Sequence, residues 1–192
     1  MKVWRIPFST NCERVAIAAG VAGVAVEWVE VDVDDRTPVQ GVSGQGRVPV
    51  AELDGEIVVG SLNIIGRVAP GLWPEGRREW SEVETFLEWF ERVWMQAIGV
   101  VFMNEDPKRV ARAGQRLDAY VERFDSLLDG REHLFGPLTI ADIAAYPFLK
   151  YATDRNPDDD YAVHDQMRAH QSIEGRPNVA AWLERIAQLP QA

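Results

Sequence analysis

The spacing of hydrophobic residues changes near residue 75. Before that point, short apolar runs alternate with polar turns, and after it apolar residues recur every three or four positions. The first pattern is typical of short strands mixed with helices, and the second of amphipathic helices. Residues 69–76 between them contain two prolines and two glycines, which is typical of a linker. The sequence therefore predicts an α/β domain over 1–70, a linker over 71–76 and an all-α domain over 77–192.

The first domain is predicted to contain two strand–helix groups. Residues 3–6 form a strand, the alanine-rich run 12–20 a helix and the alternating run 28–33 a second strand, so a right-handed parallel crossover is expected. Residues 36–45 are expected to be a loop with at most a short helix. Asp54-Gly55 between two apolar runs then predicts a β-hairpin, and Ser61 is predicted to cap a short helix that stops near Pro70.

The second domain is predicted to contain long helices. One apolar stripe runs over 80–102 and the next over 110–128, with Asp106 able to cap the second helix and Pro107 suited to its first turn. Thr139 and Asp142 have capping-box spacing at the start of a third helix, and the last helix covers 178–189. The polar stretch between them is predicted to be a solvated loop, Asp158–Asp160 included, with some helix near 163–169.

The composition limits the kinds of partner and site. The formal net charge of −10 argues against nucleic acid or an anionic membrane as the main partner. One cysteine cannot form an internal disulfide, and there is neither a signal-like segment nor an apolar run of membrane-spanning length, so a soluble, cytoplasmic protein is expected. The three histidines lie far apart in the sequence and are not in ligand spacing with the cysteine, so no metal site is predicted.

Several short motifs resemble those of the glutathione transferase superfamily. They are FSTNCERV after the first strand, GRVPV, the pair Gly60-Ser61, LTIADIAAYPFL and RPNVAAWLERIAQLP. The resemblance covers most of the chain. It implies a thioredoxin-like α/β domain followed by an all-helical domain, glutathione as co-substrate, no metal, an apolar electrophile as second substrate and a homodimer.

Ser9 stands where the serine-type classes of this superfamily have their catalytic serine. A hydroxyl beside a helix N-terminus can stabilise a bound thiolate, because unpaired N–H groups there favour an anion. Ser9 would then assist the sulfur of glutathione and not attack by itself. The local residues alone favour a plain helix cap formed by Ser9 or Thr10, whereas the resemblance favours the catalytic role. Cys12 fits half of a thioredoxin-like pair or, more simply, a buried helix residue.

The resemblance also implies a set of thiol-binding residues. Val48 would present its backbone to the ligand beside a cis Pro49, and Ser61 would bind the γ-glutamyl carboxylate. The full predicted set is Thr10, Arg47, Val48, Pro49, Gly60 and Ser61. Gly60 departs from the family, which has an acid at this position that pairs with the ligand's amino group. Such a charge-assisted contact contributes roughly 1.5–3 kcal/mol. Glu52, Asp54 or an acid of a partner subunit could replace it, or the ligand could be a different thiol.

The second substrate implies an apolar pocket. The candidate wall residues are Trp94, Ile98, Phe102 and Tyr151, although aromatic residues at helical spacing also fit a packed core. The sequence thus predicts an enzyme that activates glutathione for attack on an apolar electrophile. Two alternatives stay open: a non-catalytic binding or assembly module on the same fold, and a glutathione-dependent isomerase, dehalogenase or biosynthetic transferase.

Overall fold

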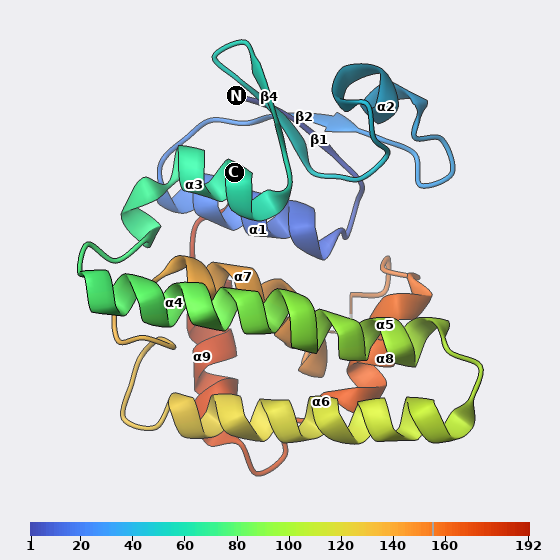
Figure 1. The fold of residues 1–192 in the computed structure, drawn as a ribbon, viewed down its shortest axis with the longest axis vertical. Coiled ribbons are helices and arrows are strands. Elements are labelled where there is room, and N and C mark those ends of the chain that lie inside the picture. The colour runs from blue at the N-terminus through green and yellow to red at the C-terminus, as the bar shows by residue number, and fades with distance from the viewer. Residues whose placement is uncertain (155) are drawn as a thin grey trace. The chain divides into compact units, whose positions relative to one another are not determined.

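The computed structural model describes residues 1–154 and 156–192. The chain divides into two compact units (Figure 1). Unit 1 contains residues 1–73 together with 188–192, and unit 2 contains residues 74–187. Each unit has its own core and is described separately.

Unit 1 is built on a four-stranded mixed sheet. The strands are β1 (Lys2–Arg5), β2 (Glu27–Glu30), β3 (Val50–Leu53) and β4 (Glu56–Val59). Their order across the sheet is β2-β1-β3-β4, with β1 parallel to β2 and the other two pairs antiparallel. The parallel β-α-β group and the following hairpin are confirmed. Strand β2 ends three residues earlier than expected, so Val31 turns into the core while Val33 is 44% exposed.

Three α-helices complete unit 1. They are α1 (Thr10–Val21), α2 (Thr37–Ser43) and α3 (Ser61–Val68), followed by the short 3-10 turn η1 (Pro70–Leu72). Helices α1 and α3 lie side by side (Figure 1), and α1 contributes a run of fully buried residues that includes Val15 and Ile17. The Ala192 N–H donates to the Ala16 carbonyl at 3.0 Å, so the last residues also pack on α1.

The β3–β4 turn has the backbone that its sequence predicts. Asp54 and Gly55 have φ angles of 51° and 83°. Two successive positive φ angles define the turn that matches the twist of a two-residue hairpin, and Asp-Gly tolerates them with little strain. The turn therefore fixes the register in which Val50 faces Val59 and Leu53 faces Glu56.

Unit 2 is helical. Its helices are α4 (Arg77–Trp89), the π-helical turn η2 (Phe90–Trp94), α5 (Met95–Met103), α6 (Pro107–Leu127), α7 (Ile140–Leu149), the 3-10 turn η3 (Lys150–Ala152), α8 (Ala162–His170) and α9 (Pro177–Ala187). Helices α4, η2 and α5 follow one another without a break, as the single apolar stripe predicts, but the π turn inside them is not visible in the hydrophobic pattern. Helix α6 begins with Asp106 as its cap, whose carboxylate accepts the Lys108 N–H at 2.9 Å.

The core of unit 2 is aromatic and is organised around one buried carboxylate. Asp142 is fully buried and its oxygens accept hydrogen bonds from the backbone N–H groups of Leu134 and Thr139 and from the indole of Trp182, at 2.9–3.0 Å. The predicted capping box of Thr139 and Asp142 is present. Asp142 therefore connects the loop before α7, the start of α7 and helix α9 in a single hydrogen-bond network.

Candidate active site

Ser9 occupies the cap position of α1 in unit 1. Strand β1 is followed by Phe8, which has a positive φ of 59°, and this turn delivers Ser9 to the helix start. The Ser9 hydroxyl accepts the Cys12 N–H at 3.4 Å, and the Ser9 carbonyl accepts the Glu13 N–H at 2.9 Å. Ser9 is thus a helix cap, and its half-buried hydroxyl stands at the positive end of the helix, where an anion is favoured.

A buried polar cluster joins the starts of α1 and α3. The Asn11 side-chain oxygen accepts from the guanidinium of Arg14 at 2.9 Å and from the hydroxyl of Ser61 at 3.2 Å. Arg14 also donates to the Ser61 hydroxyl at 3.3 Å. Arg14 is only 1% exposed, so these hydrogen bonds are made by a buried charge. The sequence did not point to Asn11 or Arg14, because a single polar residue in a helix carries no signal of burial. The cluster holds the beginning of α3 beside the first turn of α1.

Ser61 does not cap α3, and the prediction of its role as a cap is wrong. Gly60 holds the cap position with a φ of 90°, and its carbonyl accepts the Ile64 N–H. Ser61 is instead the first residue of the helix, and its hydroxyl is turned to Asn11 and Arg14. A φ of 90° favours glycine strongly, so the residue at position 60 is set by the backbone as well as by any ligand.

The start of β3 lies at the same end of the sheet. The Val48–Pro49 peptide bond is cis, as the resemblance implies. The Pro49 carbonyl accepts the Gly60 N–H at 3.3 Å, which joins the start of β3 to the start of α3. Because Trp4 faces Val50 across β1 and β3, Pro49 lies level with Arg5, the last residue of β1, at the end from which the chain passes to Ser9. Ser9, Thr10, Val48, Pro49, Gly60 and Ser61 are therefore all brought to one end of the sheet.

The segment before β3 is held by Gln45. Its side-chain amide donates to the Arg47 carbonyl at 2.9 Å and to the Ser43 hydroxyl at 3.1 Å, and its oxygen accepts the Arg47 N–H. Gln45 is therefore occupied within the loop, while the Arg47 side chain is exposed and forms no ion pair with any residue that the structure describes. Of these two, Arg47 is the residue with a charge available to a ligand.

The suggested substitutes for an acid at position 60 are not at this end of the sheet. Glu52 and Asp54 line a surface depression with Met1, Lys2 and Gly55. Leu53 faces Glu56 next to the hairpin turn, whereas Val50 faces Val59 next to Gly60, so Asp54 lies at the opposite end of the β3–β4 pair. Neither Glu52 nor Asp54 can replace the missing carboxylate, and within unit 1 that suggestion is wrong.

Cys12 is a buried helix residue with 3% exposure. Burial raises the pKa of the Cys12 thiol above its usual value, against the smaller lowering effects of the hydrogen bond with Ser9 and of the charges of Arg5 and Arg36. A thiol that stays protonated is a poor nucleophile. Cys12 is therefore a poor candidate for the nucleophile of this loop, and the role of Ser9 stays a prediction.

The arrangement agrees with comparisons to known proteins. The family model for "Glutathione S-transferase, N-terminal domain" matches residues 4–69, and the model for "Glutathione S-transferase, C-terminal domain" matches residues 107–185. The chain belongs to the glutathione transferase superfamily. The resemblance of the motifs is thereby confirmed, as is the fold of a mixed thioredoxin-like α/β domain followed by a helical one.

Individual glutathione transferases are similar along nearly the whole chain. Glutathione S-transferase L1 of Arabidopsis thaliana is 27% identical over 96% of this chain and 78% of its own. A sphingomonad glutathione S-transferase, solved in complex with glutathione, superposes with a TM-score of 0.78 at 24% identity, over 98% of this chain and 93% of that one. The Tau-class enzyme of mango, Mangifera indica, gives 0.77 at 16% identity, over 97% and 88%. These likenesses support a glutathione transferase enzyme.

The predicted wall residues of the second-substrate pocket have different surroundings within unit 2. Trp94 is fully buried, with its ring 5.4 Å from those of Phe90 and Phe124, and its indole N–H has no acceptor among the described residues. Ile98 and Tyr151 are also buried, whereas Phe102 is 48% exposed. Three of the four are thus core residues within unit 2, and their contact with a substrate stays a prediction.

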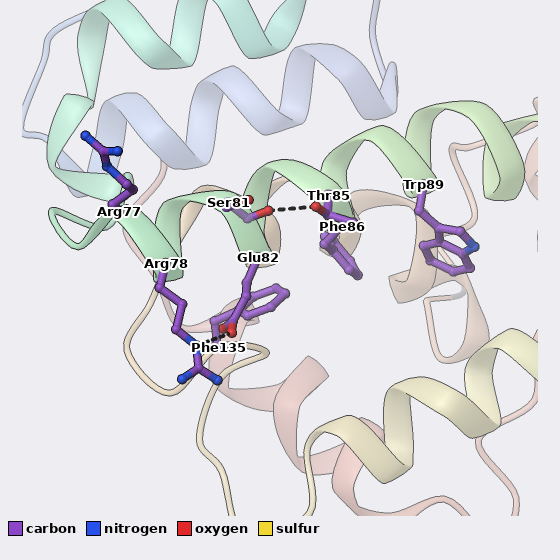
Figure 2. A pocket seen from close by; sticks show the side chains of 8 residues that line it. All are labelled: Arg77, Arg78, Ser81, Glu82, Thr85, Phe86, Trp89 and Phe135. Atoms are coloured by element: carbon purple, nitrogen blue, oxygen red, sulfur yellow. Dashed lines mark hydrogen bonds and ion pairs between the residues drawn. The ribbon is translucent and has the colours of Figure 1, made fainter.

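Unit 2 has an open cavity that none of those four residues lines. It has a volume of about 960 Å³ and lies along α4 (Figure 2). The aromatic side chains of Phe86, Trp89 and Phe135 form its apolar part, and Arg78 and Glu82 pair at its edge at 3.0 Å. The sequence pattern placed Phe86 in the helix stripe but gave no sign of Phe135, which comes from the loop before α7.

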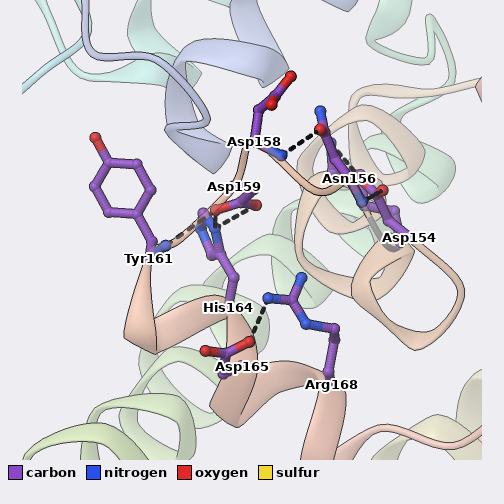
Figure 3. Close-up of polar contacts among 9 residues, drawn as sticks. Asp154, Asn156, Asp158, Asp159, Tyr161, His164, Asp165 and Arg168 are labelled. Carbon is purple, nitrogen blue, oxygen red and sulfur yellow. Dashed lines mark hydrogen bonds and ion pairs between the residues drawn. The ribbon is translucent and has the colours of Figure 1, made fainter.

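The acidic run before α8 is not uniformly solvated, contrary to the prediction. Asp158 and Asp160 are exposed, but Asp159 is 6% exposed and both its oxygens lie 2.8 Å from Nδ1 of His164 (Figure 3). His164 stacks on Tyr151 with the ring centres 4.1 Å apart. The pair joins the loop to α8, so this part of the run has a structural role.

Burial and pairing shift the protonation of these two groups. Burial lowers the pKa of His164, and the neighbouring Asp159 offsets this only in part. Burial acts to raise the pKa of Asp159, but the hydrogen bond and charge of His164 outweigh it and the pKa lies below its usual value. At neutral pH the pair is therefore an ionised carboxylate that accepts a hydrogen bond from a neutral imidazole.

The described residues contain neither a candidate metal site nor a candidate membrane span. Outside Arg155, His, Cys, Asp and Glu side chains do not gather in groups of three or more that could hold a metal ion. Within the same residues, the helices are too short or too polar to cross a bilayer.

Proposed function

We propose that this protein is a glutathione transferase in which Ser9 stabilises the glutathione thiolate and an apolar electrophile is the second substrate. The observation that carries the proposal is the position of the Ser9 hydroxyl at the positive end of α1, beside the start of β3 and the start of α3. This hydroxyl accepts the Cys12 N–H, and its own hydrogen can be donated to a sulfur, either that of Cys12 or that of a bound ligand.

The chemistry follows from the preference of the site for an anion. A hydrogen bond from Ser9 and the helix end stabilise the thiolate more than the thiol, so the sulfur loses its proton more readily near neutral pH. The thiolate then attacks an electrophilic carbon; a sulfur–carbon bond forms and a leaving group departs with its electron pair. Ser9 remains a hydrogen-bond donor throughout and forms no covalent bond.

The peptide part of glutathione is assigned to the other residues at this end of unit 1. The backbone of Val48 beside the cis Pro49 would pair with the cysteinyl residue as an added strand does. Ser61 and the start of α3, with the backbone of Gly60, would bind the γ-glutamyl carboxylate, and Arg47 the glycyl carboxylate. Thr10 is assigned to the sulfur end, next to Ser9.

The remaining assignments rest on membership of the family. The second substrate would be an apolar electrophile held by the helical unit, with Trp94, Ile98, Phe102 and Tyr151 as candidate contacts. We further infer that the protein acts in the cytoplasm as a homodimer. Analytical ultracentrifugation tests the dimer directly, because a single species of 21.6 kDa at all concentrations would rule it out.

The catalytic proposal is tested by replacing Ser9 with alanine. Loss of one donor to a developing anion costs about 10²–10³ in turnover in comparable sites. We therefore expect Ser9→Ala to lower conjugation of glutathione to an activated aryl chloride about 10²-fold or more. Ser126→Ala is the matched control, because the Ser126 hydroxyl is exposed and donates only to the Glu122 carbonyl of its own helix. Equal turnover in both variants would exclude the assigned role of Ser9.

Gly60 supports a second candidate: a protein of this family that binds weakly to glutathione or acts as a non-catalytic binding module. No carboxylate stands at position 60, and the nearby strand acids lie at the other end of the hairpin. Calorimetric titration separates the candidates. Heat of binding at millimolar glutathione supports the enzyme, and its absence supports the module. A glutathione-dependent isomerase or dehalogenase would share the thiol site and differ in its turnover of electrophiles.

A further inference from the structure

One face of α6 carries a row of cations that the fold of this chain does not use. Residues 107–117 contain four cationic side chains and no acid, in a protein with a net charge of −10. At 3.6 residues per turn, the basic side chains of the whole helix fall within about 100° of arc and span about 22 Å of its length. This basic face of α6 consists of Lys108, Arg109, Arg112, Arg116 and Arg123, all of them exposed.

The basic face has almost no carboxylate partners. Among the residues that the structure describes, its only ion pair joins Arg109 to Asp106 at 3.8 Å, at the limit of such a contact. Some cations elsewhere are paired more closely: Arg67 lies 2.8 Å from Glu56, and Arg78 lies 3.0 Å from Glu82. The charges of the basic face are therefore not neutralised within the chain.

Two of the three acids of α6, Asp118 and Asp125, lie on another face and are used by the fold, and the third, Glu122, is exposed outside the row. Asp118 pairs with Arg176 at 2.6 Å. Asp125 accepts the N–H groups of Asn178 and Val179 at the start of α9, at 2.9 and 3.0 Å. Two carboxylates of the helix are thus directed to its own unit, whereas the cations of the basic face are directed to solvent.

This separation has a cost to the helix. Lys108, Arg112 and Arg116 are four residues apart, and like charges at that spacing repel each other along a helix. The buried side of α6, with Leu117, Val121 and Phe124, would pack equally well with neutral residues on the exposed side. The row therefore destabilises the isolated helix slightly and contributes nothing to the packing of the unit.

We propose that the basic face of α6 is a docking site for an acidic helical segment of another protein. The charges of such a segment would match the basic face in both sign and spacing. Carboxylates at every fourth position of a partner helix recur about every 6 Å, the same interval that separates Lys108, Arg112 and Arg116. The pairs would form at an exposed surface, so they would give orientation and a fast, salt-sensitive association more than high affinity.

Other polyanions fit the face less well. A nucleic-acid strand is bound by cations interleaved with exposed aromatic rings for base stacking, whereas the one aromatic residue beside this row, Tyr120, is engaged with Trp89 at 5.2 Å. An anionic bilayer is flat and would meet a wider surface than the row, in a chain of net charge −10. A face one helix wide and about four turns long suits one helix of a protein.

The test uses the full chain and a fluorescent, alanine-rich helical peptide with glutamate at every fourth position. Fluorescence anisotropy in about 50 mM salt should show saturable binding that weakens at least tenfold in 200 mM salt. The double variant R112Q/R116Q should weaken binding at least tenfold. R77Q/R92Q is the matched control, since it removes the same charge from two exposed arginines of the helix 77–103 region and should change binding less than twofold. K108Q/R123Q is a second pair on the row and should behave as R112Q/R116Q does.

Four outcomes would overturn the proposal. The first two are no binding of the peptide at low salt and equal weakening of binding in the row and control variants. The third is tighter binding of single-stranded oligonucleotides, or of vesicles with anionic lipid, than of the peptide. The fourth is dissociation of a homodimer by R112Q/R116Q, which would assign the face to a second copy of this chain. None of them depends on transferase activity, so the result is independent of the function proposed above.

Discussion

The hydroxyl of Ser61 donates to the side-chain oxygen of Asn11 at 3.2 Å, across fifty residues of sequence. Arg14, buried beside them, donates to both. The start of α3 is thereby fixed to the first turn of α1, where Ser9 stands. A site that must hold a peptide at α3 and its sulfur at α1 needs this distance to be constant, and the cluster supplies that constraint.

Ser61→Ala should therefore affect both stability and binding. Removing one partner from a buried hydrogen-bonded cluster costs about 1–3 kcal/mol, so the free energy of unfolding should fall by that amount. The affinity for glutathione should fall as well, because the proposed carboxylate contact is lost. Urea denaturation and calorimetric titration measure the two effects. A drop in stability with unchanged glutathione affinity would limit Ser61 to a structural role.

Gly60→Glu should not restore the acidic residue of the family. Gly60 has a φ of 90°, and a side chain in that conformation is strained by about 1–3 kcal/mol. We expect a lower melting temperature and no gain in glutathione affinity. Gly41→Glu is the matched control, because a Cβ at Gly41 would have open space and its backbone is helical. A stable Gly60→Glu protein with tighter binding would show that the backbone adapts.

The sequence predicts the elements of this fold well where one local rule decides them. The Asp54-Gly55 turn, the capping box of Thr139 and the apolar stripes of the long helices all follow from spacing and residue type. It predicts the candidate thiol site through motifs alone. Ser9 and Pro49 could be named before their positions were known, because each belongs to a short motif of the family.

The remainder depends on contacts that are distant in the sequence. Gly60 takes the cap position because the backbone between β4 and α3 turns through a positive φ, which leaves the Ser61 hydroxyl for Asn11. Arg14 and Asp159 are charged residues, and only tertiary packing buries them. Local patterns carry no information about such partners. The prediction that Ser61 caps α3 and the prediction that Asp159 is solvated are therefore both wrong.

Asp142→Asn should destabilise unit 2 strongly. The Asp142 carboxylate accepts hydrogen bonds from two backbone N–H groups, the Thr139 hydroxyl and the Trp182 indole. An amide nitrogen at one of the two oxygen positions would face donors, so several buried bonds are lost together, and we expect about 3 kcal/mol. Asp129→Asn, at an exposed position, should change the free energy of unfolding by less than about 0.5 kcal/mol. Equal urea midpoints for the two variants would contradict the role of Asp142.

The Asp159–His164 pair should make the stability of unit 2 depend on pH. The pKa of His164 is lowered by burial, so the folded chain binds a proton less tightly than the unfolded chain, whose histidine titrates near 6.5. The stability contributed by the pair is therefore complete above about pH 6.5 and falls as the pH drops through the folded pKa. Asp159, whose pKa is also lowered below its usual value, acts in the same direction at lower pH.

Lys150 and Arg168 strengthen this dependence. Both cations lie over the ring of Tyr151, on which His164 stacks, and a proton on His164 would add a third positive charge to that group. We expect the melting temperature of the protein to fall between pH 7 and pH 5, and His164→Gln to flatten that fall while it lowers stability at pH 7. Asp160→Asn, which alters an exposed neighbour, should keep the slope of the unaltered protein. A His164→Gln curve parallel to that of the unaltered protein would show that another group titrates.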